Sequence, residues 1–562
     1  MSVDARSAQL AAKQAHELSQ HAFISILEPA RIAELAASAG DGPLAGMPFA
    51  VKDNIDVAGV PTTAACPALD APAPEHAHVV ARLIAAGAIP VAKTNMDQFA
   101  TGLVGTRSPY GACHSVYSPD HVSGGSSSGS AVAVASGVVP LALGTDTAGS
   151  GRVPAAFNGL VGMKPSRGLV SNTGLLPACP SLDCITTFTT TVTQAAAVFD
   201  VVVGYDAADP YSRPMPPALP AGVARHMRVI AVPAGPLALD PEHEQAWQQA
   251  LAHAATVALL VPVDIEPFLA AARLLYEAPF VSERTAAFGA LLEPDGPHLD
   301  PTVRSIVLRG AEFTAAQSFA AAHELARLRR LTEAAFVSAD ALLLPVTPWH
   351  PTLAQVAADP IGANSCNGVF TNMTNLLDLC AIALPAGERA DGLPFGIQLL
   401  APAFGDVPLL ELAATWTGER VMDAWAPEPH RTLVAVAGAH LSGQPANPQL
   451  IGLGGHLHAR ARTAAGYRMY TVPGPFPRPG LIGTGDGPST GIEIEVWSLP
   501  TVTIDQLVAT IAPPLLLGPL ELDDGTTVLG FIAEPGAADP ARDITDFGGW
   551  RAFVTARERL QR

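Results

Sequence analysis

The chain has 562 residues, of which 49% are hydrophobic and only 15% are charged. That length exceeds what one ordinary core fills, so we expect at least two domains with much of the chain in their interiors. The net charge of −19 argues against nucleic acid or an anionic membrane as a partner, but a small anionic substrate held by one buried arginine is compatible with it.

The N-terminal part predicts alternating helices and strands. Helical spacing extends to about Ala37, a strand pattern covers 48–57, and residues 76–87 are amphipathic and precede a short buried strand at 89–92. The alternation continues to about residue 425 and includes ALLLPV at 341–346, which is typical of a buried central strand. This order predicts an α/β fold, with a mixed, largely parallel sheet covered by helices.

The pattern changes after residue 425. APEPH at 426–430 is linker-like, and short period-two segments follow at 467–472, 492–496 and 526–533, separated by turns rich in proline and glycine. We therefore predict a boundary near residues 430–445. The chain would comprise a large domain over 1–430 and a smaller, strand-rich α+β domain over 440–562.

Cysteine usage and the N-terminus predict a cytoplasmic protein. The six cysteines form no CxxC pair, so buried thiols in a reducing compartment are expected. The N-terminus is charged where a signal peptide would be apolar, and Gly or Pro interrupts the long apolar stretches. His456 and His458 have no third ligand nearby in the sequence, so we expect no metal and no cofactor.

Two serine-bearing glycine turns and an upstream lysine predict a nucleophilic site. SGGSSSGS contains Ser126, GTDTAGSGR contains Ser150, and GMPFAVKDNIDVAG contains Lys52. A serine needs a neighbouring base, and a lysine can serve once burial lowers its pKa. Lys52 lies among apolar residues on a predicted strand, so its amine requires polar partners, which two serine hydroxyls would supply.

The turn from Thr147 through Ala148 and Gly149 to Ser150 can present consecutive backbone N–H groups to a developing oxyanion. In the first turn, Gly125 brings backbone close to substrate. Each motif alone is more often an ordinary flexible turn or a solvated strand-end charge. The three in this order favour catalysis.

These motifs resemble the amidase signature family over about residues 20–425. The resemblance rests on GMPFAVKDNIDVAGVPTT, AKTNMDQFATG, SGGSSSGS, GTDTAGSGRVPAAFNGLVGMKPSRG and DGLPFGIQLLAP. It implies that Lys52 is the general base, that Ser126 is a bridging serine on a cis peptide and that Ser150 is the acylated nucleophile, with the oxyanion bound by the backbone of 147–150. Ser128 and Gly151 depart from the usual glycine and aliphatic residue at their positions.

Gly151, together with GLLPACPSLDC and LYEAPFVSER, is similar to the allophanate hydrolase branch. The resemblance implies that Tyr276 and Arg284 bind the substrate. Eight residues is a little over two helical turns, so both side chains are expected to share one face of a helix, where the guanidinium can bind a carboxylate in a two-pronged contact. Without the resemblance, Arg284 would be expected to be an ordinary surface charge.

RTAAGYRMYTV, GIEIEVWSLP and DITDFGGWRAF resemble the C-terminal domain of that branch, which implies a fold akin to gamma-glutamyl cyclotransferases. One role suggested for that domain is decarboxylation of the first product. The resemblance further implies a homodimer acting on allophanate in urea or cyanuric acid breakdown. A separate urea carboxylase or biuret hydrolase would supply the substrate. Another small-amide hydrolase, or a non-catalytic scaffold on this fold, is the alternative.

Overall fold

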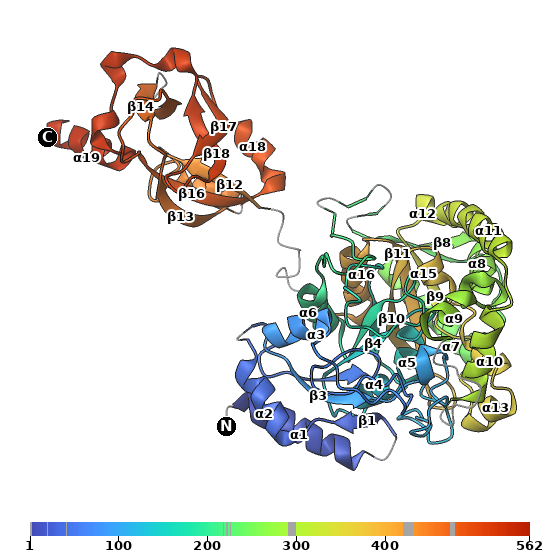
Figure 1. The fold of residues 1–562 in the computed structure, drawn as a ribbon. Helices are drawn as coiled ribbons and strands as arrows, with labels where there is room; N and C mark the ends of the chain where they lie inside the picture. The colour runs from blue at the N-terminus through green and yellow to red at the C-terminus, as the bar shows by residue number, and fades with distance from the viewer. Residues whose placement is uncertain are drawn as a thin grey trace. The chain divides into compact units, whose positions relative to one another are not determined.

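The protein is described by a computed structural model that covers residues 3–18, 21–40, 42–216, 219–220, 223–224, 226–289, 299–419, 431–453, 455–472 and 478–561. The chain divides into two compact units, Met1–Trp425 and Ala426–Arg562. Each has its own sheet, with 11 strands in the first and seven in the second (Figure 1). The linker predicted at 426–430 lies outside the described residues.

The sheet of the first unit runs in the order β1-β3-β2-β4-β6-β5-β10-β11-β9-β7-β8. Its strands are β1 (Phe23–Ile26), β2 (Pro48–Lys52), β3 (Ile89–Thr94), β4 (Leu141–Thr145), β5 (Val161–Lys164), β6 (Ile185–Thr189), β7 (Val229–Pro233), β8 (Leu259–Val263), β9 (Ala341–Pro345), β10 (Leu379–Glu388) and β11 (Pro394–Pro402). The mixed α/β fold is confirmed, but the prediction that the sheet is largely parallel is wrong: among the described strand pairs four are parallel and six are antiparallel. One reason is that only a short turn joins β10 to β11, and such a connection requires antiparallel pairing. Parallel pairing joins β3, β2 and β4 near one end and β9, β7 and β8 at the other, whereas the centre is antiparallel.

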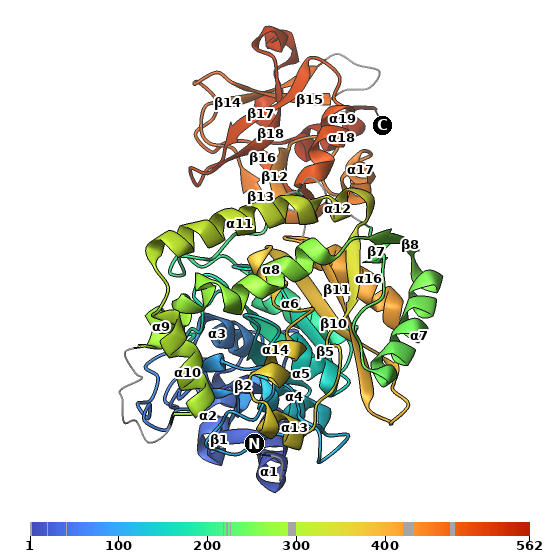
Figure 2. The same ribbon diagram turned by 90° about the vertical axis from the view of Figure 1, so that its right-hand side faces the viewer.

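Helices cover both faces of this sheet (Figure 2). They are α1 (Val3–Glu17), α2 (Pro29–Ser38), α3 (His78–Ala85), α4 (Ser128–Ala135), α5 (Arg152–Phe157), α6 (Val192–Val202), α7 (Pro241–Val257), α8 (Glu266–Glu277), α9 (Ser282–Phe288), α10 (Pro301–Gly310), α11 (Ala315–Glu333), α12 (Ala335–Ser338), α13 (Leu353–Ala358), α14 (Gly362–Asn367), α15 (Met373–Leu376) and α16 (Asp406–Thr417). Strand β9 explains why both faces need cover: Leu343 packs with α6, α7 and α16, whereas the next residue, Leu344, packs with α8, α11 and α15.

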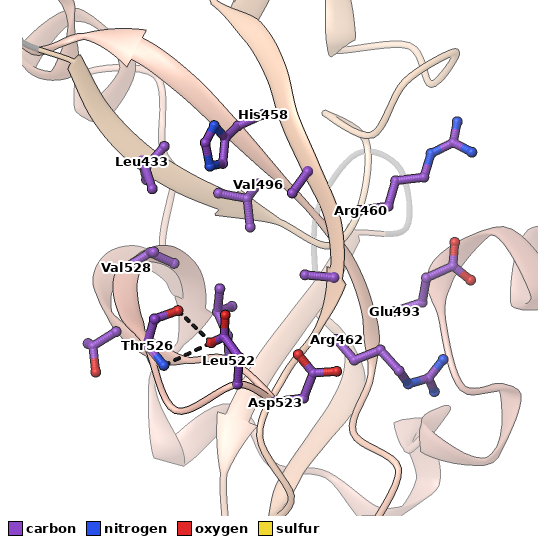
Figure 3. Close-up of a pocket in the computed structure, with 14 residues that line it drawn as sticks. Leu433, His458, Arg460, Arg462, Glu493, Val496, Leu522, Asp523, Thr526 and Val528 are labelled. Atoms are coloured by element: carbon purple, nitrogen blue, oxygen red, sulfur yellow. Dashed lines mark hydrogen bonds between the residues drawn. The ribbon is translucent and has the colours of Figure 1, made fainter.

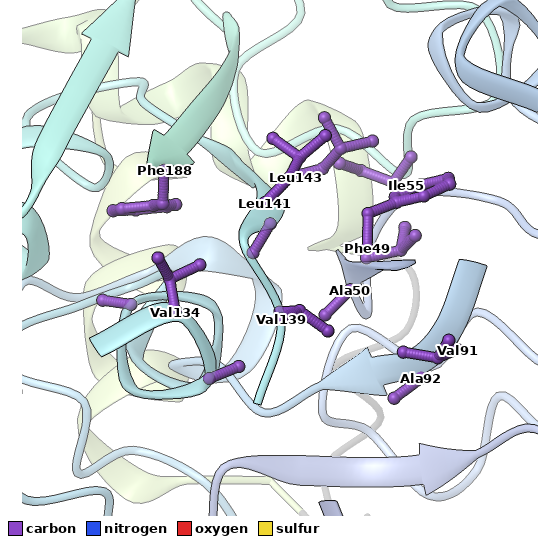
Figure 4. Packing of buried hydrophobic residues seen from close by; sticks show 14 of the residues in the cluster. Phe49, Ala50, Ile55, Val91, Ala92, Val134, Val139, Leu141, Leu143 and Phe188 are labelled. Atoms are coloured by element: carbon purple, nitrogen blue, oxygen red, sulfur yellow. The ribbon is translucent and has the colours of Figure 1, made fainter. Parts of the chain in front are cut away.

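The strands that carry the predicted site lie in a third cluster. Side chains from β2, β3 and β4 meet those of α4 there, and every residue of β2 is buried (Figure 4). The predicted strand at 48–57 ends early, at Lys52, because the N–H of Ile55 donates to the Lys52 carbonyl and turns the chain. Lys52 therefore occupies the carboxyl end of a buried strand.

The second unit contains the order β13-β16-β12-β18-β15-β14, with β17 beside β18. Its elements are β12 (Arg431–Val436), α17 (Asn447–Gly452), β13 (His456–Arg462), β14 (Tyr467–Val472), β15 (Arg478–Gly483), β16 (Glu493–Pro500), α18 (Ile504–Val508), β17 (Leu515–Glu521), β18 (Thr527–Ala533) and α19 (Trp550–Gln561). Strand β12 belongs to this unit although it precedes residue 440. Within the described residues, no helix is both long and apolar enough to cross a bilayer.

Candidate active site

Lys52 is fully buried and hydrogen-bonded to two hydroxyls. Its Nζ donates to Ser126 Oγ at 2.7 Å and to Thr145 Oγ1 at 2.6 Å. Removal from water lowers the pKa of Lys52 to about 7, although Asp97, Asp183 and Asp146 act in the opposite direction. A substantial fraction of this amine is therefore uncharged near neutral pH.

The second hydroxyl partner of Lys52 differs from the expectation. The sequence predicted two serines, whereas the structure gives Ser126 and Thr145. The reason is strand register: β2 and β4 are parallel, with Val51 beside Leu143, so the ends of the two strands lie together. Thr145 belongs to the motif GTDTAGSGR, but the motif alone does not show that its strand pairs with β2.

Ser126 lies between β3 and α4 in sequence, after a cis peptide bond with Gly125. Its carbonyl accepts from the Asp97 N–H at 3.1 Å. The Asp97 carboxylate accepts from the N–H groups of Val104, Gly105 and Arg107 and ties that loop down. A Cβ at Gly125 would lie 2.0 Å from Asp97 Oδ2, so this position has room only for glycine.

Ser150 lies on the turn between β4 and α5. The turn is held by the buried ion pair of Asp146 and Arg152, and the Asp146 carboxylate also accepts from the N–H of Gly151. Ser150 Oγ donates to the Gly102 carbonyl at 3.5 Å. Within the described part of the chain, no hydrogen bond joins Ser150 to Ser126 or Lys52. The structure thus joins two of the three predicted catalytic residues directly and places the third on a separate, rigid turn.

The backbone before Ser150 presents free donors. Among the described residues, no group accepts from the N–H groups of 147–150. Asn375 Nδ2 donates to the carbonyls of Asp146 and Thr147, at 2.6 and 3.1 Å. In a trans peptide the next N–H points the opposite way, so the N–H groups of Thr147 and Ala148 are directed away from Asn375. Gly149 has φ +141°, and a Cβ there would lie 2.3 Å from Thr371 Oγ1.

Tyr276 and Arg284 lie together, but not on one helix. The predicted shared helix is wrong: α8 ends at Glu277, and α9 begins only at Ser282, because Pro279 cannot continue α8. Arg284 Nη2 nevertheless donates to Tyr276 Oη at 3.3 Å, and the guanidinium lies 5.2 Å from the ring centroid. The contact is made by the bend between the helices.

Arg284 is a buried charge that forms no ion pair with a carboxylate of the described residues. It is 0% exposed, its Nη1 donates to Cys179 Sγ at 2.8 Å, and its Nε has no partner among the described residues. Burial acts to lower the pKa of Arg284, but Cys179, Tyr276 and nearby carboxyl groups raise it above the ordinary value. Arg284 therefore stays cationic, and its guanidinium retains the capacity to bind an anion.

Asp183 connects the turn that carries Ser150 with the Arg284 region, and the sequence predicted no role for it. Its carboxylate accepts from Thr147 Oγ1 and from the N–H groups of Ala178 and Cys179. Burial raises the pKa of Asp183 to about 6, against the effect of these hydrogen bonds and of Arg284. Its segment, GLLPACPSLDC, contributed to the resemblance, but nothing in the sequence places Asp183 beside Thr147.

The described residues contain no group of three His, Cys, Asp or Glu side chains that could hold a metal ion. His458 instead lines an open cavity of about 730 Å³ in the second unit, with Arg460, Arg462 and Glu493 (Figure 3). Arg460 and Arg462 follow His458 at every second position of β13, as strand alternation requires.

Comparison with known proteins gives matches over both units. Residues 6–410 match the family model described as Amidase, and residues 432–555 match the one described as Allophanate hydrolase C-terminal domain. The chain is 40% identical to the urea amidolyase of Lachancea kluyveri over 95% of its own length, and it covers 31% of that protein.

Two further likenesses differ in extent. A glutamyl-tRNA(Gln) amidotransferase subunit from Symbiobacterium thermophilum is 35% identical over 70% of this chain and 87% of its own. A solved serine-to-alanine variant of Kluyveromyces lactis allophanate hydrolase is 37% identical, with a TM-score of 0.72, and the match covers 98% of this chain and 96% of that one. Of these two, only the second match extends over nearly the whole chain.

Proposed function

Because the chain belongs to the amidase family and carries an allophanate hydrolase C-terminal domain, we propose that it hydrolyses allophanate (urea-1-carboxylate) to ammonia and carbon dioxide. The observation that carries the mechanism is the buried Lys52 amine, with a pKa of about 7, hydrogen-bonded to Ser126. A neutral amine in contact with a serine hydroxyl is a base poised to activate a nucleophile.

In the proposed acylation, Ser150 is the nucleophile. Its proton passes to Ser126 as the proton of Ser126 passes to neutral Lys52, and Ser150 Oγ bonds to the amide carbon of allophanate. The N–H groups of 147–150 bind the oxyanion. The C–NH₂ bond then breaks, and the proton returns from Lys52 through Ser126 to the departing ammonia. Catalytic hydrogen bonds commonly tighten once substrate is bound, so Ser150 is expected to turn from Gly102 toward Ser126.

Hydrolysis of the acyl-enzyme uses the same groups. Water loses a proton through Ser126 to Lys52, its oxygen bonds to the acyl carbon, and the bond to Ser150 breaks as the proton returns to Oγ. Allophanate and water thus give ammonium and a nitrogen that carries two carboxylates. Protonation of that dianion and loss of one carbon dioxide leave carbamate, and a second protonation with loss of a second carbon dioxide releases the remaining nitrogen as ammonia.

Arg284 and Tyr276 are proposed to bind the substrate carboxylate. Support comes from the absence of a carboxylate partner for Arg284 in the described residues and from its contact with Tyr276. A buried cation is stabilised when an anion arrives, and a two-pronged guanidinium contact fixes the anion's orientation. Gly125 contributes closely approaching backbone rather than a side chain.

Another amidase that acts on an uncharged amide, or on glutamine, is the second candidate, favoured by the likeness to the amidotransferase. An uncharged amide would give Arg284 no anion to bind, whereas glutamine would present its α-carboxylate. We also propose that the protein is a homodimer. We propose a cytoplasmic location as well, with which the six free cysteines are consistent. We further propose that a urea carboxylase or a biuret hydrolase supplies the allophanate, in line with the likeness to a urea amidolyase.

Ammonia release from allophanate, malonamate and an uncharged aliphatic amide tests the proposal. We expect allophanate to have the highest kcat/KM and Ser150→Ala to abolish its turnover without loss of the folded state. Ser338→Ala, on α12 and outside the site, is the matched control and should change the rate less than about two-fold. Turnover by Ser150→Ala, or a preference for the uncharged amide, would contradict the proposal.

A further inference from the structure

Asn375 holds the backbone that precedes Ser150 from outside the turn. It lies on α15, is buried and donates through Nδ2 to the carbonyls of Asp146 and Thr147. Each of these carbonyls belongs to a trans peptide whose N–H points the opposite way, so one side-chain amide fixes the direction of two N–H groups. These are the N–H groups of Thr147 and Ala148, which are among the proposed donors to the oxyanion.

Lys164 determines which way the amide of Asn375 faces. Its Nζ donates to Asn375 Oδ1 at 2.8 Å and to the Pro165 carbonyl at 2.7 Å. If the amide were turned over, Nδ2 would face the Nζ donor and Oδ1 would face the two backbone carbonyls, so no hydrogen bond would remain on either side. The hydrogen bond from Lys164 therefore favours the orientation in which Nδ2 reaches the turn that carries Ser150.

The place of Lys164 in the sheet is unusual for a lysine. It is the last residue of β5, it is fully buried, and within the described ranges it forms no ion pair with a carboxylate. The preceding Met163 packs with α6, α7 and α16, so strand alternation directs Lys164 to the opposite face, where residues of α15 pack. A buried lysine needs acceptors for its donors, and here Asn375 supplies one of them.

We infer that Lys164 is a positioning residue for oxyanion binding and acts through Asn375. It keeps the Asn375 amide in the orientation that directs the N–H groups of Thr147 and Ala148 to the oxyanion. Such preorganised donors stabilise the transition state more than the substrate, because the negative charge develops only as the reaction proceeds. The inference rests on the proposed function for the role of these N–H groups, and it gives Lys164 a part distinct from that of the base, Lys52.

Lys164→Met tests this role, because methionine has a similar length but no donor. The Asn375 amide then loses the group that orients it, so kcat should fall about 10- to 100-fold while KM changes less than about three-fold. Both constants are measured on whichever amide of the panel above the parent protein hydrolyses fastest. A smaller amount of folded protein would also lower the apparent kcat, so a second measurement is needed.

Methylboronic acid gives a dissociation constant that does not depend on the amount of folded protein. Its boron bonds to Ser150 Oγ, the serine proton passes through Ser126 to Lys52, and the tetrahedral adduct carries one negative charge. Calorimetry on the full chain measures its binding. We expect Lys164→Met to raise this dissociation constant by about the factor by which it lowers kcat/KM, because both depend on the same N–H groups.

Cys184 provides a matched control, because its Sγ contacts the same Asn375 Oδ1, at 3.7 Å, and is also buried. A thiol is a weak donor, so Cys184→Ala should change kcat and boronate binding less than about three-fold. The double variant Lys164→Met/Asn375→Leu should be no more impaired than Asn375→Leu alone, since both residues belong to one chain of hydrogen bonds.

Additive losses in the double variant would overturn the inference, as would a lower kcat in Lys164→Met without the matching loss of boronate affinity. An equal loss in Cys184→Ala would show that packing alone is responsible. Asn375→Asp keeps an acceptor for Lys164 but places an oxygen where Nδ2 faces the carbonyls. Unchanged kcat and boronate affinity in Asn375→Asp would refute the inference even if Lys164→Met does not fold.

The same measurements separate this inference from the proposed function. Turnover of allophanate by the parent protein without these paired effects in the variants refutes the inference alone. If the parent protein prefers another amide, or hydrolyses none, and Lys164→Met still weakens boronate binding, only the proposed function is refuted.

Discussion

Lys52 and Arg284 are equally buried but differ in their state of charge near neutral pH. Both are 0% exposed, and both touch the candidate site through a hydroxyl group, Ser126 for the lysine and Tyr276 for the arginine. Burial lowers the pKa of Lys52 to about 7, whereas Arg284 stays charged. The difference teaches that burial can leave an amine partly neutral and a guanidinium fully charged, because the two groups begin from different intrinsic pKa values.

The two regions are also built differently. Lys52 and Thr145 end neighbouring parallel strands, so sheet register sets their contact. Arg284 reaches Tyr276 across the break between α8 and α9. The relay region therefore depends on the core of the sheet, and the anion-binding region depends on peripheral helices. Each prediction below changes one region and asks whether the other retains its function.

The largest effect is expected from Lys52→Met. Loss of the base should reduce kcat/KM for allophanate by about 10³-fold or more, as for other members of a catalytic unit.

The same variant also tests stability. Between pH 7 and 10.5 the lysine of the unfolded chain binds a proton that Lys52 of the folded chain lacks, so the contribution of Lys52 to the free energy of unfolding rises with pH in that window. At pH 7 the variant should consequently unfold at the same or a higher temperature. Calorimetry checks this, and a large drop in Tm would show that Lys52 acts structurally.

Arg284→Met should separate the two regions. We expect a loss of about 10- to 100-fold in kcat/KM for allophanate, because one charge-assisted contact to the carboxylate disappears. The loss for an uncharged amide should be only a few-fold, since the Lys52 relay remains. Steady-state ammonia release on both substrates measures the ratio. Equal losses would mean that Arg284 positions the site without binding the carboxylate.

The pH dependence of kcat/KM should report the relay. The base acts only when neutral, so kcat/KM should fall below pH 7, about tenfold for each pH unit, and reach a plateau above it. This fall is the acid limb of the pH profile. The same acid limb should appear in Arg284→Met, because the guanidinium does not titrate in this range. A pH profile of single-substrate kinetics from pH 5 to 9 provides the measurement. A limb that disappears in Arg284→Met would contradict the separation of the two regions.

The smallest effect is expected from Asp183→Asn, which links the regions. Its negative charge raises the pKa of Lys52, so its removal should move the acid limb to lower pH, while weakened support of Thr147 lowers the plateau less than about tenfold. Asp120→Asn provides a matched control on an exposed loop, where the limb should stay in place. An unmoved limb in Asp183→Asn would leave Asp183 with a packing role only.

The sequence predicted much of the relay because local patterns specify it. The apolar flanks of Lys52 predicted its burial, and the glycine turns located Ser126 and Ser150. Thr145 was missed because its role depends on which strand lies beside β2, and Asp183 because its partner, Thr147, lies 36 positions away. The shared helix of Tyr276 and Arg284 was wrong because spacing was weighed without the proline between them.

By itself, the sequence determined the mixed α/β architecture, the strand-rich second part of the chain and the two serine-bearing glycine turns, since periodicity and turn residues are local properties. Only the tertiary structure decided that Lys52 has a threonine as its second partner, that Arg284 is wholly buried and that Asp183 lies beside Thr147. These features depend on contacts between distant segments, because desolvation and strand register arise only when the chain is packed.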